Sequence, residues 1–134
     1  HPNIVAVREF AVSSQGVPFM VMDYLDGMPL SELIKKSSII PELALKFVIE
    51  VADALSHAHN RGIVHRDLKP SNIMIIKDSE NGHKAVLVDF GIAKIFSLPG
   101  NMSLRLTQTG EVFGSPLYMS PEQCTGRKVD TRSD

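Results

Sequence analysis

Residues 62–75, with the sequence GIVHRDLKPSNIMI, place charged and amide side chains between two aliphatic runs. A surface loop does not need the flanking isoleucines and valine, and a buried strand would not tolerate the charges. The segment is therefore predicted to be a polar loop that is rigidly anchored at both ends, and loops of this kind often carry chemistry. Its candidate functional side chains are His65, Arg66, Asp67, Lys69 and Asn72.

A hairpin is predicted to bring another acidic residue to this loop. The aliphatic runs 73–76 and 85–88 flank a polar segment with an Asn-Gly pair, which is the strongest short-range signal for a β-hairpin. In such a hairpin the chain leaves the loop and returns to it. Asn72, before the first strand, would then lie beside Asp89, after the second, because antiparallel neighbours are about 5 Å apart.

The convergence of Asp67, Asn72 and Asp89 would suit phosphoryl transfer. Two carboxylates and an amide oxygen make a hard-oxygen site for Mg²⁺, which completes its coordination with waters and phosphates. Lys69 supplies a point positive charge suited to a phosphate oxygen. An aspartate that is not a metal ligand can accept a proton from a hydroxyl group, which is worth about 10²- to 10⁴-fold in rate. The alternative for Asp89 alone is an ordinary turn or cap residue.

The elements that must position this loop can be read from the apolar pattern. Residues 4–12 and 17–25 are predicted to be two paired strands, and residues 30–36 a short amphipathic helix. A longer helix is expected to begin at Pro41, where a missing amide proton costs nothing, and to end at Gly62 as a left-handed C-cap. Its buried stripe recurs at steps of three and four residues: Leu43, Phe47, Val51, Ala54, Leu55 and Ala58. Residues 92–118 are predicted to be a long surface loop.

The overall composition is that of an ordinary soluble globular protein. The chain has 134 residues, a formal net charge of −1 and 43% hydrophobic residues, enough for one domain at most. We expect no nucleic acid partner, because the charges balance, and no membrane segment, because no apolar run approaches about 20 residues. The single cysteine, Cys124, favours a reducing, cytoplasmic setting. The abrupt ends indicate a piece of a larger protein, which could be membrane-anchored.

The motifs resemble those of the protein kinase family, and their wording resembles bacterial serine/threonine kinases. HRDLKPSN at 65–72 is similar to the catalytic loop, DFG at 89–91 to the metal-binding motif and SPE at 120–122 to the A-P-E motif. The resemblance implies an α+β, protein-kinase-like fold in which this chain is a partial catalytic domain. Residues 1–25 would be the last N-lobe strands and the hinge. Residues 26–134 would be the first half of the C-lobe, with the catalytic loop and activation segment.

The same resemblance assigns roles in catalysis. Asp67 would accept the proton of the substrate hydroxyl, and Asn72 and Asp89 would hold two Mg²⁺ ions, for which Mn²⁺ could substitute. Lys69 resembles the residue with which serine/threonine kinases contact the transferring phosphate, so protein substrates with serine or threonine acceptors are expected. ATP would be bound by these residues together with a gatekeeper and hinge consisting of Met22, Asp23, Tyr24 and Leu25.

Structural and regulatory roles are implied in the same way. Val7, His65 and Phe90 resemble members of a stacked apolar spine, and plain core is the alternative for Val7. Gly91 has a permissive backbone, and Glu122 belongs to the P-E motif. Asp134 resembles the aspartate that braces the catalytic loop. Arg66, directly before Asp67, is expected to be partly buried and to need a counter-charge. Phosphorylation of Thr107 or Thr109 would supply that charge. Ser115 sits where the family has a hydroxyl residue next to the substrate.

Several kinase features are missing from the sequence. No glycine-rich phosphate loop precedes the first predicted strands, the sequence has neither the strand lysine nor the helix glutamate of the family, and Lys35 and Lys36 are no substitutes. Pro29 falls near a position where many kinases have an acidic ribose contact. We therefore expect an active parent protein but an inactive fragment. The alternatives are a pseudokinase or interaction module, and a small-molecule phosphotransferase of kinase-like fold; the residues upstream of His1 would distinguish the first of these.

Overall fold

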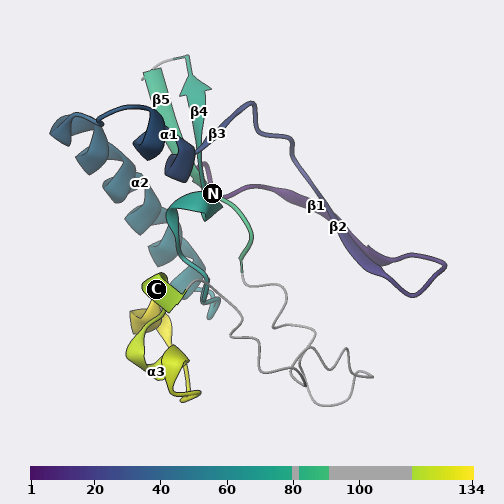
Figure 1. Ribbon diagram of the computed structural model, residues 1–134. Coiled ribbons are helices and arrows are strands. Elements are labelled where there is room, and N and C mark those ends of the chain that lie inside the picture. The colour runs from purple at the N-terminus through teal and green to yellow at the C-terminus, as the bar shows by residue number, and fades with distance from the viewer. Residues whose placement is uncertain (80–81, 91–115) are drawn as a thin grey trace.

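One long helix and two small antiparallel sheets position the polar loop (Figure 1). The structure is a computed structural model, and it describes residues 1–79, 82–90 and 116–134. The fold class is α+β, as predicted. Two strands come first, helices follow, and a hairpin comes after the polar loop. No helix within these three ranges combines the length and the apolar character needed to cross a membrane.

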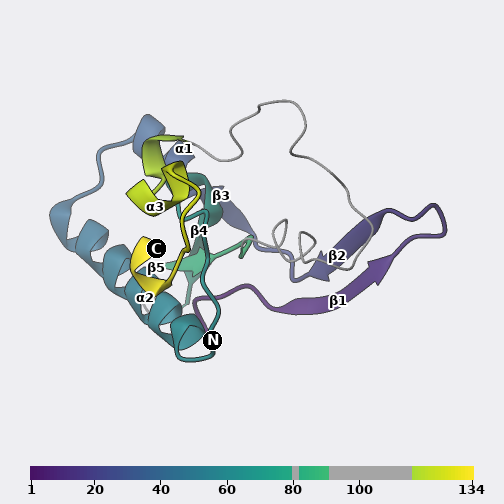
Figure 2. The same ribbon diagram turned by 90° about the horizontal axis from the view of Figure 1, so that it is seen from below.

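The first sheet is a two-stranded ribbon of β1 (Val7–Val12) and β2 (Pro18–Met22). The strands pair antiparallel with Phe10 opposite Met20, which confirms the predicted pairing. Both are shorter than predicted, and at the start of β1 Ile4 instead forms a parallel bridge to Leu87. The ribbon extends away from the helices in both views (Figures 1 and 2).

The second sheet has the order β3-β4-β5, formed by β3 (Gly27–Pro29), β4 (Ile73–Asp78) and β5 (Gly82–Leu87). The predicted hairpin is present as β4 and β5, and it extends further toward its turn than the aliphatic runs indicated. Strand β3 was not predicted. It pairs antiparallel with β4 and needs Gly27, because a Cβ there would lie 2.3 Å from the carbonyl oxygen of Ile75.

Helices α1 (Leu30–Lys36) and α2 (Pro41–His59) begin where the sequence predicts. After α2 the chain turns sharply at Gly62, which has a φ of +72°. The N–H of Gly62 donates to the carbonyl of His59 at 2.9 Å, and the N–H of Ile63 donates to the carbonyl of Ala58 at 3.0 Å. These two bonds form a Schellman motif, so the predicted glycine C-cap is confirmed.

The hydrophobic core lies between α2 and the β4–β5 hairpin. The buried stripe of α2 packs against inward-facing residues of both strands, and Leu87 is fully buried. Burying one such large aliphatic side chain stabilises the fold by about 1.5–3 kcal/mol. This packing fixes both strand ends that carry the candidate site. The buried members of the core are Phe47, Ala54, Ile73, Ile75, Ala85 and Leu87.

The C-terminal residues fold back under the loop. The end of the described chain lies at the C-terminal end of α2, where Asp134 contacts His59, and helix α3 (Pro121–Cys124) is seen below α2 in Figure 1. Three short 3₁₀ turns, 70–72, 116–118 and 131–133, complete the described structure. Residues 91–115, which make up most of the predicted long loop, lie outside the described residues.

Candidate active site

His65 is the fully buried anchor of the polar loop. Its Nε2 lies 3.1 Å from the carbonyl oxygen of Val88, and its Nδ1 lies 3.3 Å from the backbone nitrogen of Asp67. A carbonyl can only accept and an N–H can only donate, so the network assigns the neutral tautomer with the proton on Nε2. The ring also packs against Phe90 with 4.7 Å between centroids. The two predicted partners of the apolar stack are therefore in contact.

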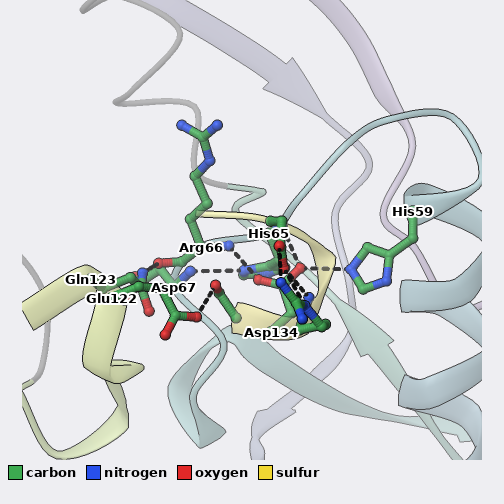
Figure 3. A network of polar contacts seen from close by, with 10 residues as sticks. His59, His65, Arg66, Asp67, Glu122, Gln123 and Asp134 are labelled. Atoms are coloured by element: carbon green, nitrogen blue, oxygen red, sulfur yellow. Dashed lines mark hydrogen bonds and ion pairs between the residues drawn. The ribbon is translucent and has the colours of Figure 1, made fainter. Parts of the chain in front are cut away.

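Arg66 has a left-handed backbone, with a φ of +67°. For a residue with a Cβ this conformation costs about 1–2 kcal/mol, so the surroundings must hold it in place. One carboxylate does so, because Asp134 accepts the N–H of His65 on Oδ2 and the N–H of Arg66 on Oδ1, both at 2.7 Å (Figure 3). Asp134 thus contacts the loop as a brace would. Its Oδ2 also lies 2.8 Å from Nε2 of His59 at the end of α2.

The side chain of Arg66 differs from the sequence-based expectation. It was expected to be partly buried, but it is exposed and points away from the Asp134 network (Figure 3). Within the described part of the chain, no carboxylate forms an ion pair with its guanidinium. The likewise predicted Gly91, Thr107, Thr109 and Ser115 lie outside the described residues.

The carboxylate of Asp67 is the centre of a small polar cluster. Its Oδ2 lies 2.7 Å from Nζ of Lys69 and accepts a 3.0 Å hydrogen bond from Nδ2 of Asn72. The same amide nitrogen donates to the Asp67 carbonyl at 2.9 Å. Asn72 is buried, whereas Asp67 and Lys69 are partly exposed. The loop therefore brings an acid, a cation and an amide together at its open side.

The β4–β5 hairpin places Asp89 next to this cluster. Ile73 pairs with Leu87, and one step further the N–H of Val88 donates to the carbonyl of Asn72 at 3.0 Å. Asp89 follows directly, exposed and with a left-handed φ of +57°. Because both bonds of Asn72 to Asp67 use its amide nitrogen, its Oδ1 is the atom that can serve a cation. The donor set of one amide oxygen and carboxylates fits Mg²⁺.

Glu122 and Gln123 connect α3 to other parts of the site. The hydroxyl of Ser133 donates to Glu122, and this hydrogen bond is the main reason that the pKa of Glu122 lies below its usual range. Gln123 donates from Nε2 to the carbonyl oxygen of Arg66 at 2.7 Å. The carboxylate of Glu122 therefore contacts the last 3₁₀ turn, and Gln123 contacts the polar loop.

The predicted hinge lies directly after β2. Met22 and Leu25 are half-buried, whereas Tyr24 is 91% exposed. Asp23 donates its N–H to the carbonyl of Ala6 at 3.0 Å, and Arg8 binds its carboxylate in a two-pronged ion pair at 2.5 and 2.9 Å. The Arg8 hydrogen bond lowers the pKa of Asp23. The side chain of Asp23 is thus directed to β1, while the backbone of this segment is what could contact an adenine.

Some of the sequence-based expectations need correction or addition. Val7 is 51% exposed on β1, so neither the buried stack nor the plain core describes its position. Sequence reasoning missed the contact of His59 with Asp134 and that of Gln123 with the loop. For Gln123 the available signal covered only the cap of α3, because Ser-Pro-Glu-Gln has the spacing of the capping box that Ser120 and Gln123 form. For His59 no local signal existed.

Comparisons with known proteins agree with this geometry. A family model described as a protein kinase domain matches residues 1–134. The chain is 41% identical over 138 residues to a probable serine/threonine-protein kinase of Streptomyces coelicolor, with 100% of this chain and 20% of the relative covered. It is 40% identical over 138 residues to the serine/threonine-protein kinase PknB of Mycolicibacterium smegmatis, with 100% of this chain and 21% of the relative covered. The chain thus spans about a fifth of the length of these relatives.

A solved structure of a kinase domain is also similar to this chain. The crystal structure of a double mutant of the Mycobacterium tuberculosis PknI kinase domain aligns with a TM-score of 0.74 and 28% identity. The alignment covers 100% of this chain and 46% of that chain. The two-sheet and helix arrangement described above therefore corresponds to part of a larger, known domain.

Proposed function

The chain belongs to the protein kinase family, and from this we propose that the whole protein transfers the γ-phosphoryl group of ATP to serine and threonine hydroxyls of protein substrates. The observation that carries the proposal is the position of the Asp67 carboxylate, 2.7 Å from Lys69 Nζ and 3.0 Å from Asn72 Nδ2. It lies at the base of the hairpin that leads to Asp89. An acid, a cation and two oxygen ligands at one loop are the parts that phosphoryl transfer requires.

We assign Asp67 the role of proton acceptor. Its carboxylate would orient the substrate hydroxyl and accept its proton as the oxygen attacks phosphorus, while the bond from phosphorus to the departing ADP oxygen breaks. The Asn72 amide holds Asp67 by its carboxylate and its backbone carbonyl, which restricts the side chain. Lys69 carries positive charge to the same place, where it would contact a phosphate oxygen once a nucleotide separates it from Asp67.

We assign Asn72 and Asp89 the role of metal ligands. Asn72 Oδ1 and the exposed carboxylate of Asp89 would hold Mg²⁺, or Mn²⁺ in its place. Bound there, the metal would neutralise charge on the β- and γ-phosphates. The assignment is supported by the bond from Val88 N–H to the Asn72 carbonyl, which keeps the backbone next to Asp89 beside that of Asn72.

The remaining assignments concern ATP, regulation and domain organisation. We assign residues 1–25 to the last N-lobe strands and the hinge, where the backbone of Met22–Leu25 would bind adenine, and residues 26–134 to the C-lobe. The exposed Arg66 guanidinium is available for a phosphate on Thr107 or Thr109. Residues 1–134 contain neither a glycine-rich phosphate loop nor the strand lysine, so this segment alone is expected to be inactive.

The test uses the whole protein with labelled ATP and a generic protein substrate, with and without a chelator. The proposal predicts metal-dependent labelling that phosphoamino acid analysis assigns to serine or threonine. Labelling of tyrosine alone, or none with any protein substrate, would contradict it. For residues 1–134 alone, labelling above that of an Asp67→Asn control would overturn the expected inactivity.

A further inference from the structure

The peptide bond between Arg66 and Asp67 is held at both of its polar atoms. Its N–H, which belongs to Asp67, points to Nδ1 of His65 at 3.3 Å. Its carbonyl, which belongs to Arg66, accepts from Nε2 of Gln123 at 2.7 Å. Because a peptide unit is planar, two hydrogen bonds on opposite edges define its orientation, and this sets the direction in which Asp67 leaves the backbone.

Arg66, the residue before this bond, has a strained backbone conformation that its surroundings must stabilise. Arg66 has a φ of +67°, and its N–H is bound by Asp134. Asp134 therefore holds the amide side of the strained residue, and Gln123 holds the carbonyl side. Both come from the C-terminal part of the chain, and Figure 3 shows them on either side of Arg66. Loss of either one would leave one side of the left-handed residue without its partner.

Gln123 is itself oriented by a second set of bonds. Its Oε1 accepts from the N–H of Ser120 at 3.0 Å, and its own N–H donates to Ser120 Oγ at 3.4 Å. These bonds form the capping box of α3. Because Oε1 is occupied by a donor, only Nε2 can face Arg66, and Nε2 is the end that a carbonyl requires. The cap thus presents an amide donor to the loop.

We propose that Gln123 is a positioning residue for Asp67, acting through the Arg66 carbonyl and linking the cap of α3 to the proton-accepting side chain. The inference rests on the proposed function, in which Asp67 accepts the proton. No hydrogen bond joins Gln123 directly to Asp67 among the described residues, so its influence passes through the Arg66 carbonyl. Its effect is on the turnover step, and the binding of ATP at the distant hinge is left unchanged.

A matched substitution separates this role from that of the cap. In Gln123→Glu a carboxylate oxygen still accepts the Ser120 N–H, because glutamate is the usual residue of a capping box. The donor to Arg66 is lost, and an oxygen faces the carbonyl instead. We expect kcat of the whole protein to fall about ten- to hundredfold with the KM for ATP changed less than about twofold. Cys124→Ser, at the exposed neighbour on α3, is the control and should leave both unchanged.

Hydrogen exchange gives a readout that does not depend on activity. In Gln123→Glu, and in Gln123→Met as a second variant without a donor, the amides of the catalytic loop around Asp67 should exchange faster than in the wild type. Those of α2 should not change. Unchanged kcat, or unchanged exchange at the loop in a folded variant, overturns the positioning role. An inactive wild-type protein would overturn the proposed function instead, and the exchange rates would still decide the role of Gln123.

Discussion

The backbone N–H of Val88 donates to the carbonyl of Asn72 at 3.0 Å, one step beyond the last paired residues of the hairpin. This bond joins Asn72 of the polar loop to Val88, the residue that precedes Asp89. It is the physical link between two segments that the sequence separates by a strand, a turn and a second strand. The residues proposed as metal ligands and as proton acceptor therefore lie on backbone segments that this hydrogen bond connects.

The first prediction concerns the metal. Asp89→Asn in the whole protein should raise the Mg²⁺ concentration needed for half-maximal turnover by at least about tenfold, because the site loses a charged ligand. Turnover measured against free Mg²⁺ tests this. Asp26→Asn, the same change at an exposed position, should leave the metal dependence at its wild-type value. Equal curves for Asp89→Asn and wild type would remove Asp89 from the metal site.

The second prediction concerns the brace of the loop. The Asp134 side chain is fully buried and accepts from two backbone N–H groups, so Asp134→Ala would leave both without that partner. We expect a loss of about 1–3 kcal/mol in the free energy of unfolding, together with lost activity. Chemical denaturation measures the first quantity. Asp53→Ala, on the exposed face of α2, should change neither, and an equally stable Asp134→Ala protein would refute the brace.

The third prediction concerns the core that supports the hairpin. Leu87 is fully buried between α2 and β4, so Leu87→Ala should destabilise the protein by about 2–5 kcal/mol. Val48→Ala, on the exposed side of α2, is the matched apolar control and should cost much less. Thermal and chemical denaturation of both variants distinguish a core position from a surface one. Similar losses for the two would contradict the described packing.

The fourth prediction concerns pH. The pKa of Glu122 is lowered in the folded protein, chiefly by the hydrogen bond from Ser133. A lowered folded pKa means that the stabilisation is present above the unfolded value of 4.5 and is lost as the pH falls through the folded value. Ser133→Ala should therefore weaken stability at neutral pH and flatten its decline in acid. Parallel pH profiles of wild type and variant would show that the bond does not contribute.

The local elements were predictable because their signals are local. Pro41 marks the start of α2, Gly62 its end, and the Asn-Gly pair the hairpin, each within a few residues of the structure it specifies. The grouping of Asp67, Lys69 and Asn72 followed from their places in one loop. The position of Asp89 could be predicted because an antiparallel hairpin brings the end of its second strand beside the start of its first.

The parts that escaped prediction depend on contacts between distant residues. Strand β3 forms only because β4, far along the chain, supplies its partner. The bond from Gln123 to Arg66 spans 57 residues. The two bonds from Asp134 span 69 and 68 residues, and this contact was expected only through the resemblance to the kinase family. The exposure of Arg66 depends on the left-handed turn of its backbone, which these distant groups hold. Sequence spacing carries no information about such pairs.

The most direct test of the central claim is the turnover of the whole protein after Asp67→Asn, measured with saturating ATP and Mg²⁺ beside an Asp53→Asn control. If Asp67 accepts the proton, kcat should fall about 10²- to 10⁴-fold while the Kd for ATP stays near the wild-type value. A variant that retains wild-type turnover would show that the chemistry is carried elsewhere.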